Sequence, residues 1–492
     1  MGHSRCRLCG MSCLNTSPAV RRRHAAAPAR ARFVALAAGS LLLGPVVEGC
    51  RSPVSSPADP GDQRPAASRL VRKAPTLAAQ ARLLVQRTTK LRELPLLRPV
   101  PIKILTRKQL LARIRERQQV LGVDRRPSHF TIGDGRASRC PPPQASEPGA
   151  SLAALRRLGL IPHGVDVKKV QHAMLGGTVA GSFDPVDQTL NVAAEIPLDR
   201  QAPTLVHEIC HALQRQHGLA SRLPVSRDSD QQLAHLALVE GDCEGVSLEY
   251  LLAPSGRDLS SPNVSPAEVR RKMYPSAAQG KAMRDAPHYL KAMSAFPYIA
   301  GLRFIRSARR RYPWHRLTQR LYADPPESTS QLLHPELYWR RQRPLRLPTP
   351  PLESLERAGW CAIHRDTLGE FRLRLHLLLA LDERAAIRAA AGWGADRLVA
   401  YRAASSRALP LVVSLSAWRT LADAQEFARA EQRVFARLAR PVEARAAGAA
   451  HFRDADDQRW SIEQRGTRVL LLLGVPPKLH SALQRELWQR WR

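Results

Sequence analysis

The chain has 492 residues, which is long enough for two or three domains. Its hydrophobic content of 44% is ordinary for a globular protein, and 76 basic against 42 acidic residues give a net charge of +34. The excess is mostly arginine scattered over the whole chain, without a zinc-finger, RNP-like or helix-turn-helix pattern. We interpret the charge as compositional bias and do not expect nucleic acid as a partner.

The first 50 residues are typical of an export signal. Five arginines, at positions 21, 22, 23, 30 and 32, precede the apolar run 33–47. That run is shorter than the roughly 20 residues that a membrane-spanning helix needs, and it has the length of a signal-peptide core. Residues 46–50 then read Val-Val-Glu-Gly-Cys, which resembles a bacterial lipobox in which Glu48 is unusual. We expect cleavage and lipidation at Cys50, and hence an exported protein anchored to the membrane of the cell envelope, on the outer-membrane or periplasmic side. The alternative is a plain secretory signal with a coincidental cysteine.

Five segments follow the signal. Residues 51–76 are rich in Pro, Ser, Ala and Arg, which predicts a flexible tether. Apolar residues at helical spacing predict helices over 77–93 and 107–121. Two strands are predicted over 178–183 and 189–193, because the residues between them supply turn chemistry.

A long helix is predicted over 202–217, and it should end at Gly218, since glycine readily adopts the left-handed conformation that terminates helices. A second helix is predicted over about 230–252, with Ser229 or Asp230 as its N-cap. Residues 265–340 are predicted to be mostly helical.

The last third of the chain changes character. Helices are predicted over 368–381 and 421–438 and at the C-terminus, and strands over 397–401, 411–415, 460–463 and 467–473. The fold class is therefore predicted to be α+β. Residues 77–345 would form a mostly helical domain with a small strand pair before its long helix, and residues 346–492 a C-terminal α+β subdomain.

The segment His207-Glu208-Ile-Cys-His211 has the spacing of a zinc-binding catalytic motif. Two histidines at positions i and i+4 lie on one face of a helix, so both imidazoles can reach one zinc ion. Glu208 lies beside the first ligand, where it can take a proton from a zinc-bound water as a general base. The pattern predicts a Zn²⁺ site with His207 and His211 as ligands and Glu208 as the catalytic residue.

Two residues compete to be the third ligand. His217 has the spacing of the metzincin motif, but that design needs a glycine where this chain has Gln214, and a continuing helix carries His217 about 15 Å along the axis from His207. Glu240, on the next helix, fits better. Glu244 lies one turn further, where it could accept a hydrogen bond from a ligand imidazole; a solvated surface carboxylate is the equal alternative. Asp242 points about 200° away from Glu240 and is a poorer candidate.

Two cysteines lie at matching offsets, Cys210 three residues after His207 and Cys243 three after Glu240. A disulfide beside the metal is one interpretation, because an exported protein occupies an oxidising compartment. Two buried free thiols are the other. Farther on, His334 and Tyr338 could supply an oxyanion donor, although a packing turn starting at Pro335 explains them better.

These motifs together resemble a group of bacterial lipoproteins identified as zinc metallopeptidases, distant relatives of the thermolysin-like gluzincins. The resemblance covers about residues 170–435 and rests on segments 181–185, 206–217, 237–242, 325–338 and 390–397. It implies a zincin-like metallopeptidase domain with Zn²⁺ at His207, His211 and Glu240. Cys210 and Cys243 depart from the pattern, and the resemblance implies no particular substrate.

Two functions follow as hypotheses. The first is a zinc-dependent peptidase of the cell envelope, in which Glu208 moves the proton and the edge of the strand pair aligns an extended peptide. The second is a non-catalytic envelope lipoprotein that keeps the fold as a binding module. The presence of Glu208 favours the first, because a degenerate copy would tolerate its loss.

Overall fold

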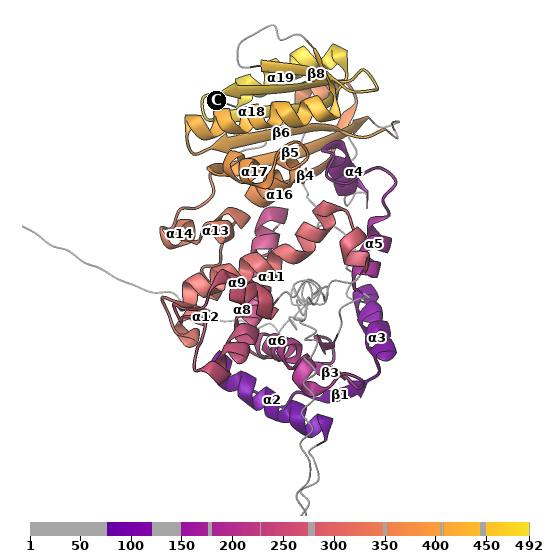
Figure 1. Ribbon diagram of the computed structural model, residues 1–492. Helices are drawn as coiled ribbons and strands as arrows, with labels where there is room; N and C mark the ends of the chain where they lie inside the picture. The colour runs from indigo at the N-terminus through magenta and orange to yellow at the C-terminus, as the bar shows by residue number, and fades with distance from the viewer. Residues whose placement is uncertain are drawn as a thin grey trace, which may run out of the picture.

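The computed structural model describes residues 76–120, 149–175, 180–226, 228–273, 281–347, 352–403, 406, 408–442 and 449–491. The predicted signal segment, with Cys50, and the tether up to residue 75 lie outside these residues. Within them, no helix combines the length and the apolar character that crossing a membrane requires. The structure is mixed α+β, as predicted, with a helical region that includes a small sheet and a C-terminal sheet region (Figure 1).

The small sheet of the helical region has three strands, not the predicted pair. Its order is β1-β3-β2, from β1 (Ile102–Leu105), β3 (Thr189–Ala193) and β2 (Gly181–Asp184). β1 pairs in parallel with β3, and β2 pairs antiparallel to β3. β1 has only four residues, too few for a period to be recognised. Because β3 occupies the centre, β2 is an edge strand, and it lies beside the first metal-site helix.

That helix, α6 (Leu198–Gln216), begins four residues before its predicted start and continues through Pro203. Gln201 explains the early start, since its side-chain amide bonds Ala193 and Ile196 and ties the first turn to the end of β3. The predicted stop is correct: Gly218 follows the helix with φ +61°. Gly181 of β2 allows the close approach to α6, because a Cβ there would lie 2.6 Å from Leu205.

The second metal-site helix is α8 (Ser229–Leu252). The predicted caps, Ser229 and Asp230, are wrong by one or two residues. Asp228 is the N-cap, and its carboxylate accepts hydrogen bonds from the first backbone N–H groups of the helix. The carboxylate of Asp366 in the sheet region also accepts the N–H of Ser229 at 2.9 Å. The start of α8 is therefore fixed from two sides.

Helices α6 and α8 run antiparallel. Ser247 donates to the carbonyl of Pro203, and Gln214, eleven residues later on α6, donates to that of Val239, eight residues earlier on α8. α8 also crosses α11 (His288–Arg309) at very short range, because a Cβ on Gly241 would lie 2.2 Å from the backbone of Gly301. Only glycine permits this crossing, which lies next to Glu240.

Other helices complete the helical region. They are α2 (Leu77–Arg92), α3 (Arg107–Val120), α5 (Val167–Leu175), α7 (Leu219–Arg222), the 3-10 turn η2 (Ala253–Ser255), α9 (Pro266–Met273), α10 (Lys281–Asp285), α12 (Trp314–Ala323), α13 (Thr329–Leu333) and α14 (Pro335–Trp339). The prediction of a mostly helical segment over 265–340 is confirmed.

The C-terminal region is built on a seven-stranded sheet of order β4-β5-β6-β10-β9-β8-β7, in which every neighbouring pair is antiparallel. Its strands are β4 (Trp360–Asp366), β5 (Trp393–Ala403), β6 (Leu411–Trp418), β7 (Arg440–Val442), β8 (Ala449–Arg453), β9 (Arg459–Arg465) and β10 (Arg468–Val475). The predicted hairpin is β9 and β10. β4, β7 and β8 were not predicted.

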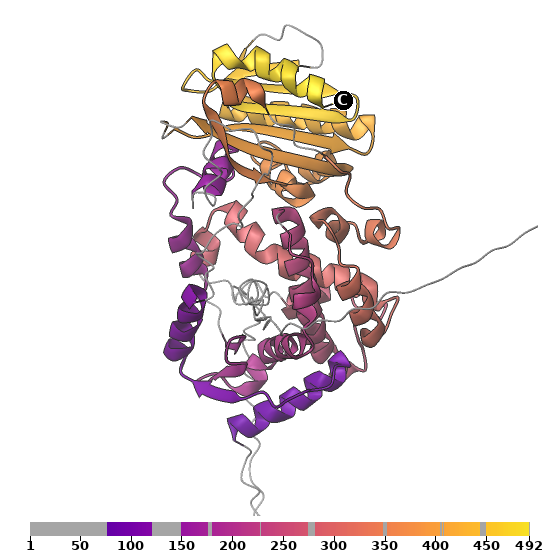
Figure 2. The same ribbon diagram turned by 180° about the vertical axis from the view of Figure 1, so that it is seen from behind.

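Helices cover both faces of this sheet (Figures 1 and 2). α16 (Gly369–Leu377), α17 (Glu383–Ala390) and α18 (Leu421–Leu438) lie on one face, and α15 (Glu353–Arg357) and α19 (Pro477–Arg490) on the other. Alternation along β10 supplies both layers: Leu471 and Leu473 pack against the first set of helices, Leu470 and Leu472 against the second. A sheet covered on both faces has continuously buried strands, as in β6, where all eight residues are buried.

The predicted boundary near residue 345 separates the two regions along the chain but not in space. α4 (Ala150–Arg157), which precedes the metal-site helices, packs in the core of the sheet region through Ala154 and Leu158. The Arg157 guanidinium donates to Asp454 at 2.9 Å and to the carbonyl of Pro410. The sheet region thus includes a segment from the first half of the chain.

Candidate metal centre

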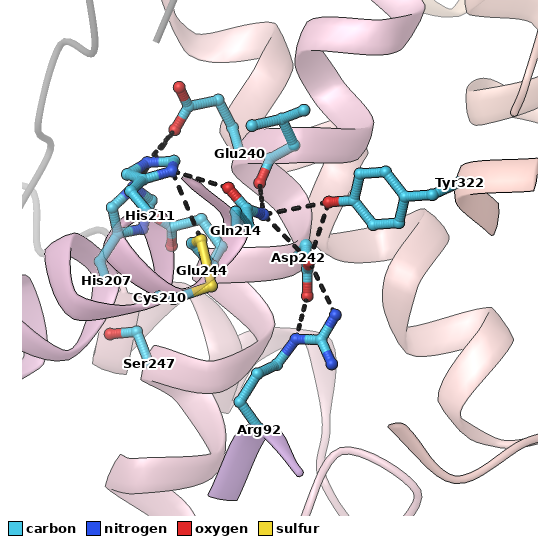
Figure 3. Close-up of a disulfide and its surroundings, with 12 residues drawn as sticks. Arg92, His207, Cys210, His211, Gln214, Glu240, Asp242, Glu244, Ser247 and Tyr322 are labelled. Carbon is cyan, nitrogen blue, oxygen red and sulfur yellow. Dashed lines mark hydrogen bonds and ion pairs between the residues drawn. A yellow bond between two sulfur atoms is a disulfide. The ribbon is translucent and has the colours of Figure 1, made fainter. Parts of the chain in front are cut away.

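The predicted ligand atoms converge on one point. Nε2 of His207 lies 3.0 Å from Nε2 of His211, and Oε2 of Glu240 lies 3.2 Å from the first and 3.3 Å from the second. Two of the three residues come from α6 and the third from α8 (Figure 3). Among the residues that the structure describes, this is the one group of three side chains found able to hold a metal ion.

The dimensions of the triangle fit zinc. Tetrahedral coordination with ligand bonds of about 2.0–2.1 Å places ligand atoms about 3.3–3.4 Å apart. The observed edges of 3.0, 3.2 and 3.3 Å are close to that value. Two imidazoles and one carboxylate also form a donor set that zinc prefers, with a fourth position left for water or substrate. The residues present therefore fit a catalytic zinc ion.

The charges at the site are arranged for a cation. Burial alone would raise the pKa of Glu240, but the two imidazoles lower it to about 2. Burial alone would lower the pKa of His207, but Glu240 and Glu244 raise it well above its ordinary value, and Glu240 raises that of His211. The carboxylates thus stabilise positive charge at this point of the protein. A divalent cation can supply that charge in place of protons on the imidazoles.

Glu208 is buried next to the ligands, at 3% exposure, and only half of its carboxylate is engaged. Oε2 accepts the backbone N–H of Phe183, on the edge strand β2, at 2.6 Å. Oε1 is buried and has no hydrogen-bond partner among the described residues. Burial raises the pKa of Glu208. A buried acceptor with one free oxygen can receive a proton from a water at the centre.

The two ligand imidazoles are held by different groups. Nδ1 of His207 lies 3.3 Å from Oε1 of Glu244, the position that the sequence indicated for an orienting carboxylate. Nδ1 of His211 lies 2.9 Å from Oε1 of Gln214, a neutral amide. In both cases Nδ1 faces an acceptor, so Nε2 can present its lone pair to a metal.

Gln214 belongs to a buried polar network that the sequence did not reveal. Its Nε2 lies 2.9–3.0 Å from three acceptors, the carbonyl of Val239, Asp242 and the hydroxyl of Tyr322, which share its two hydrogens. Asp242 in turn pairs with Arg92 of α2 through two hydrogen bonds of 2.7 and 2.9 Å (Figure 3). A glutamine three residues after a ligand lies on the ligand's face, which is a usable sequence signal. No such signal in the sequence identifies Arg92, because it lies 150 residues from its partner Asp242.

A disulfide joins the two ligand helices. Cys210 of α6 and Cys243 of α8 are bonded, with Cα atoms 5.3 Å apart. Of the two open interpretations of these cysteines, the structure therefore has the bridge. Sγ of Cys243 lies 3.5 Å from Nδ1 of His211, so the cross-link is next to the ligands.

The lower-ranked candidates have partners outside the ligand triangle, both those weighed as ligands (His217 and Asp242) and those weighed as oxyanion donors (His334 and Tyr338). Nε2 of His217 is 2.8 Å from the carbonyl of Pro95, and Asp242 faces Arg92. His334 pairs with Glu370 at 2.8 Å, and the Tyr338 hydroxyl donates to the carbonyl of Asp324. These bonds are structural.

The aromatic neighbour of the centre is a residue that the sequence did not single out. Tyr298 of α11 is buried, and its ring centroid lies 6.0 Å from that of His207 with a tilt of 32°. It stands one turn before Gly301, so the α8–α11 crossing brings it to the ligands. Only that tertiary contact identifies it.

The comparison with protein families finds a match in the sheet region. A family model described as a domain of unknown function (DUF8575) matches residues 356–483, which span the sheet region from α15 into α19. No curated protein and no solved structure matches the chain.

Proposed function

We propose that the protein is a zinc-dependent metallopeptidase of the gluzincin type, with a zincin-like helical region. The convergence of His207, His211 and Glu240 to within 3.3 Å of one another, beside the half-engaged carboxylate of Glu208, carries this proposal. A Zn²⁺ ion held by these ligands would lower the pKa of a coordinated water to about 7 and polarise a substrate carbonyl.

Glu208 is the proposed general base. The N–H of Phe183 fixes Oε2 at 2.6 Å, which leaves Oε1 to accept the proton of the attacking water. The same carboxyl group can then pass the proton to the leaving amine. Because burial raises its pKa, Glu208 binds a proton more readily than an exposed glutamate. Tyr298, beside His207, is the candidate donor to the developing oxyanion.

The edge strand β2 is the proposed substrate guide. β2 pairs with β3 on one side only, and Phe183 on it contacts the base directly. An extended peptide that adds to this edge would lie along the side of the sheet next to Glu208. This arrangement supports a peptide as substrate without indicating a preferred sequence.

Zinc analysis with matched variants tests the proposal. The purified soluble protein should contain one zinc ion per chain and cleave members of an unbiased peptide library. His207→Ala and Glu240→Ala should each lose zinc, because either change leaves an incomplete ligand set. His217→Ala is the control and should keep both zinc and activity, because His217 is the C-cap residue of the helix that carries His207 and His211. Zinc lost from His217→Ala but kept in Glu240→Ala would contradict the gluzincin-type site.

We also propose that the protein is exported and lipid-anchored to the cell envelope through Cys50. The lipobox-like sequence supports this, and the disulfide beside the metal centre suits an oxidising compartment. Cys50→Ser should release the protein from the membrane fraction or trap its precursor. An unchanged membrane fraction with a normally processed chain would contradict the anchor.

A further inference from the structure

The imidazole of His211 is oriented by an amide whose two ends differ in hydrogen-bonding character. Oε1 of Gln214 accepts from Nδ1 of His211, which forces the tautomer that leaves Nε2 free for a metal. If the amide turned over, its NH₂ group would face Nδ1. That imidazole would then carry its proton on Nε2, and it could not bind the metal. The direction of one buried amide therefore decides whether His211 is a ligand.

Three acceptors surround the NH₂ end of Gln214, share its two hydrogens and hold it away from His211. They are the carbonyl of Val239 at 3.0 Å, Oδ2 of Asp242 at 2.9 Å and the hydroxyl oxygen of Tyr322 at 3.0 Å. The Tyr322 hydroxyl donates its own hydrogen to Oδ2 of Asp242 at 2.9 Å, so its oxygen is left to accept. A turned amide would bring its carbonyl oxygen against the Asp242 carboxylate, and that arrangement is repulsive.

Arg92 keeps the carboxylate of Asp242 in place. Both side chains are fully buried, and the guanidinium holds both carboxylate oxygens, at 2.7 and 2.9 Å. The guanidinium also lies over the ring of Trp314 at 4.5 Å. A buried, bidentate arginine–carboxylate pair has one geometry, so the acceptor offered to Gln214 is fixed in position.

We propose that Asp242 and Arg92 are positioning residues of the metal site, which act through the orientation of the Gln214 amide. The chain of contacts runs from α2 through α8 and α6 to His211, so α2 takes part in preparing a centre to which it contributes no ligand. This inference rests on the metal site of the proposed function. It adds that a neutral amide serves His211 while a carboxylate serves His207.

An exchange of amide and carboxylate tests the proposal, with zinc affinity measured on the full chain by competition with a chelator. Gln214→Met removes the acceptor and should weaken zinc binding by about 10–100-fold, the usual effect of losing a partner of a ligand. Gln214→Glu should weaken it too, because the new carboxylate faces that of Asp242. The double variant Gln214→Glu/Asp242→Asn restores one donor and one acceptor in the swapped order, and it should recover most of the lost affinity.

Ser247→Ala is the matched control. It removes a hydrogen bond between α6 and α8, to the carbonyl of Pro203, without touching the imidazoles, and zinc affinity should not change. Equal zinc affinity in wild type and Gln214→Met, or no recovery in the folded double variant, would overturn the inference while the metal site stands. A wild-type chain without zinc would instead contradict the proposed function. If Gln214→Met does not fold, the single and double exchange variants give the answer.

Discussion

Two buried carboxylates, Glu240 of the helical region and Asp396 of the C-terminal sheet region, have pKa values shifted in opposite directions. Glu240 lies among imidazoles that lower its pKa to about 2, so it stays ionised in spite of burial. Asp396 of β5 accepts hydrogen bonds from the backbone of Leu368 and Gly369 and from the indole of Trp393, and burial raises its pKa to about 6. The first carboxylate is kept charged by the imidazoles beside it, where we propose that a cation binds. The second accepts backbone hydrogen bonds at the start of α16.

Both regions combine an apolar core with buried charged groups. Every residue of β6 is buried, and its neighbours in the sheet form two apolar layers with the covering helices. The helical region has an apolar core of its own and also buries the Arg92–Asp242 pair and Gln214. The sheet region buries the His376–Glu431 pair. Because buried ion pairs contribute little net stability, we expect apolar packing to carry most of the stability of both regions.

The largest expected effect separates chemistry from folding in the helical region. Glu208→Gln keeps the size and shape of the side chain but removes its basicity, so peptide hydrolysis should fall by about 10²–10⁴-fold. Zinc content should stay at the wild-type level, since Glu208 is not a ligand. Steady-state kinetics on the best library peptide and elemental analysis measure both. Full activity in this variant would exclude Glu208 as the base, and a wild type without turnover would favour the binding-module alternative.

The sheet region should respond to lost apolar volume. Phe427 of α18 is fully buried and packs against Trp418, with ring centroids 4.3 Å apart and the rings tilted by 30°. Phe427→Ala should lower the free energy of unfolding by about 3–5 kcal/mol in urea denaturation, while the folded fraction keeps its zinc affinity. Leu421→Ala on the same helix is the control, because that side chain is 50% exposed, and it should change stability little. Comparable losses in both variants would contradict the packing described for α18.

The disulfide should stabilise the helical region by restricting the unfolded chain, which apolar packing does not do. Cys210 and Cys243 close a segment with a sequence separation of 33 residues. In the chain-entropy model, Cys210→Ala/Cys243→Ala should therefore cost roughly 3–4 kcal/mol of unfolding free energy. Wild-type protein unfolded with a reductant is the matched comparison and should lose at least as much, because Cys361 is also disulfide-bonded. The double variant should lose less on reduction than the wild type does. If denaturation is the same with and without the bridge, the cross-link contributes nothing.

The smallest expected effect concerns pH. Because burial raises the pKa of Asp396 from 3.8 to about 6, the unfolded chain releases this proton at lower pH than the folded protein does. Ionising Asp396 therefore destabilises the folded protein. This loss of unfolding free energy is absent below about pH 4, grows as pH rises to 6, and should reach about 3 kcal/mol. Asp396→Asn cannot ionise and should lack this part of the pH dependence. Urea denaturation of both proteins at pH 4 to 7 measures the difference. The same pH dependence of unfolding free energy in both proteins would show that folding does not raise the pKa of Asp396.

Local patterns in the sequence determined the elements that carry the chemistry. The i, i+4 spacing of His207 and His211 places both on one face of α6 whatever the rest of the chain does. Gly218 ends that helix for a reason confined to its own backbone, and α18 has the predicted bounds of 421–438. The fold class and the strands β3, β5, β6, β9 and β10 followed from the same short-range periodicity, with the bounds shifted at some ends.

Only the tertiary structure decided what surrounds the ligands and where the regions meet. The pairing of Asp242 with Arg92 spans 150 residues, and Tyr298 reaches His207 because two glycines let α8 and α11 cross closely. The position of α4 in the core of the sheet region likewise depends on contacts with residues some 250 to 300 positions away, such as that between Arg157 and Asp454. Periodicity shows which face of an element is buried but not its partner, because the partner is chosen by packing over the whole chain.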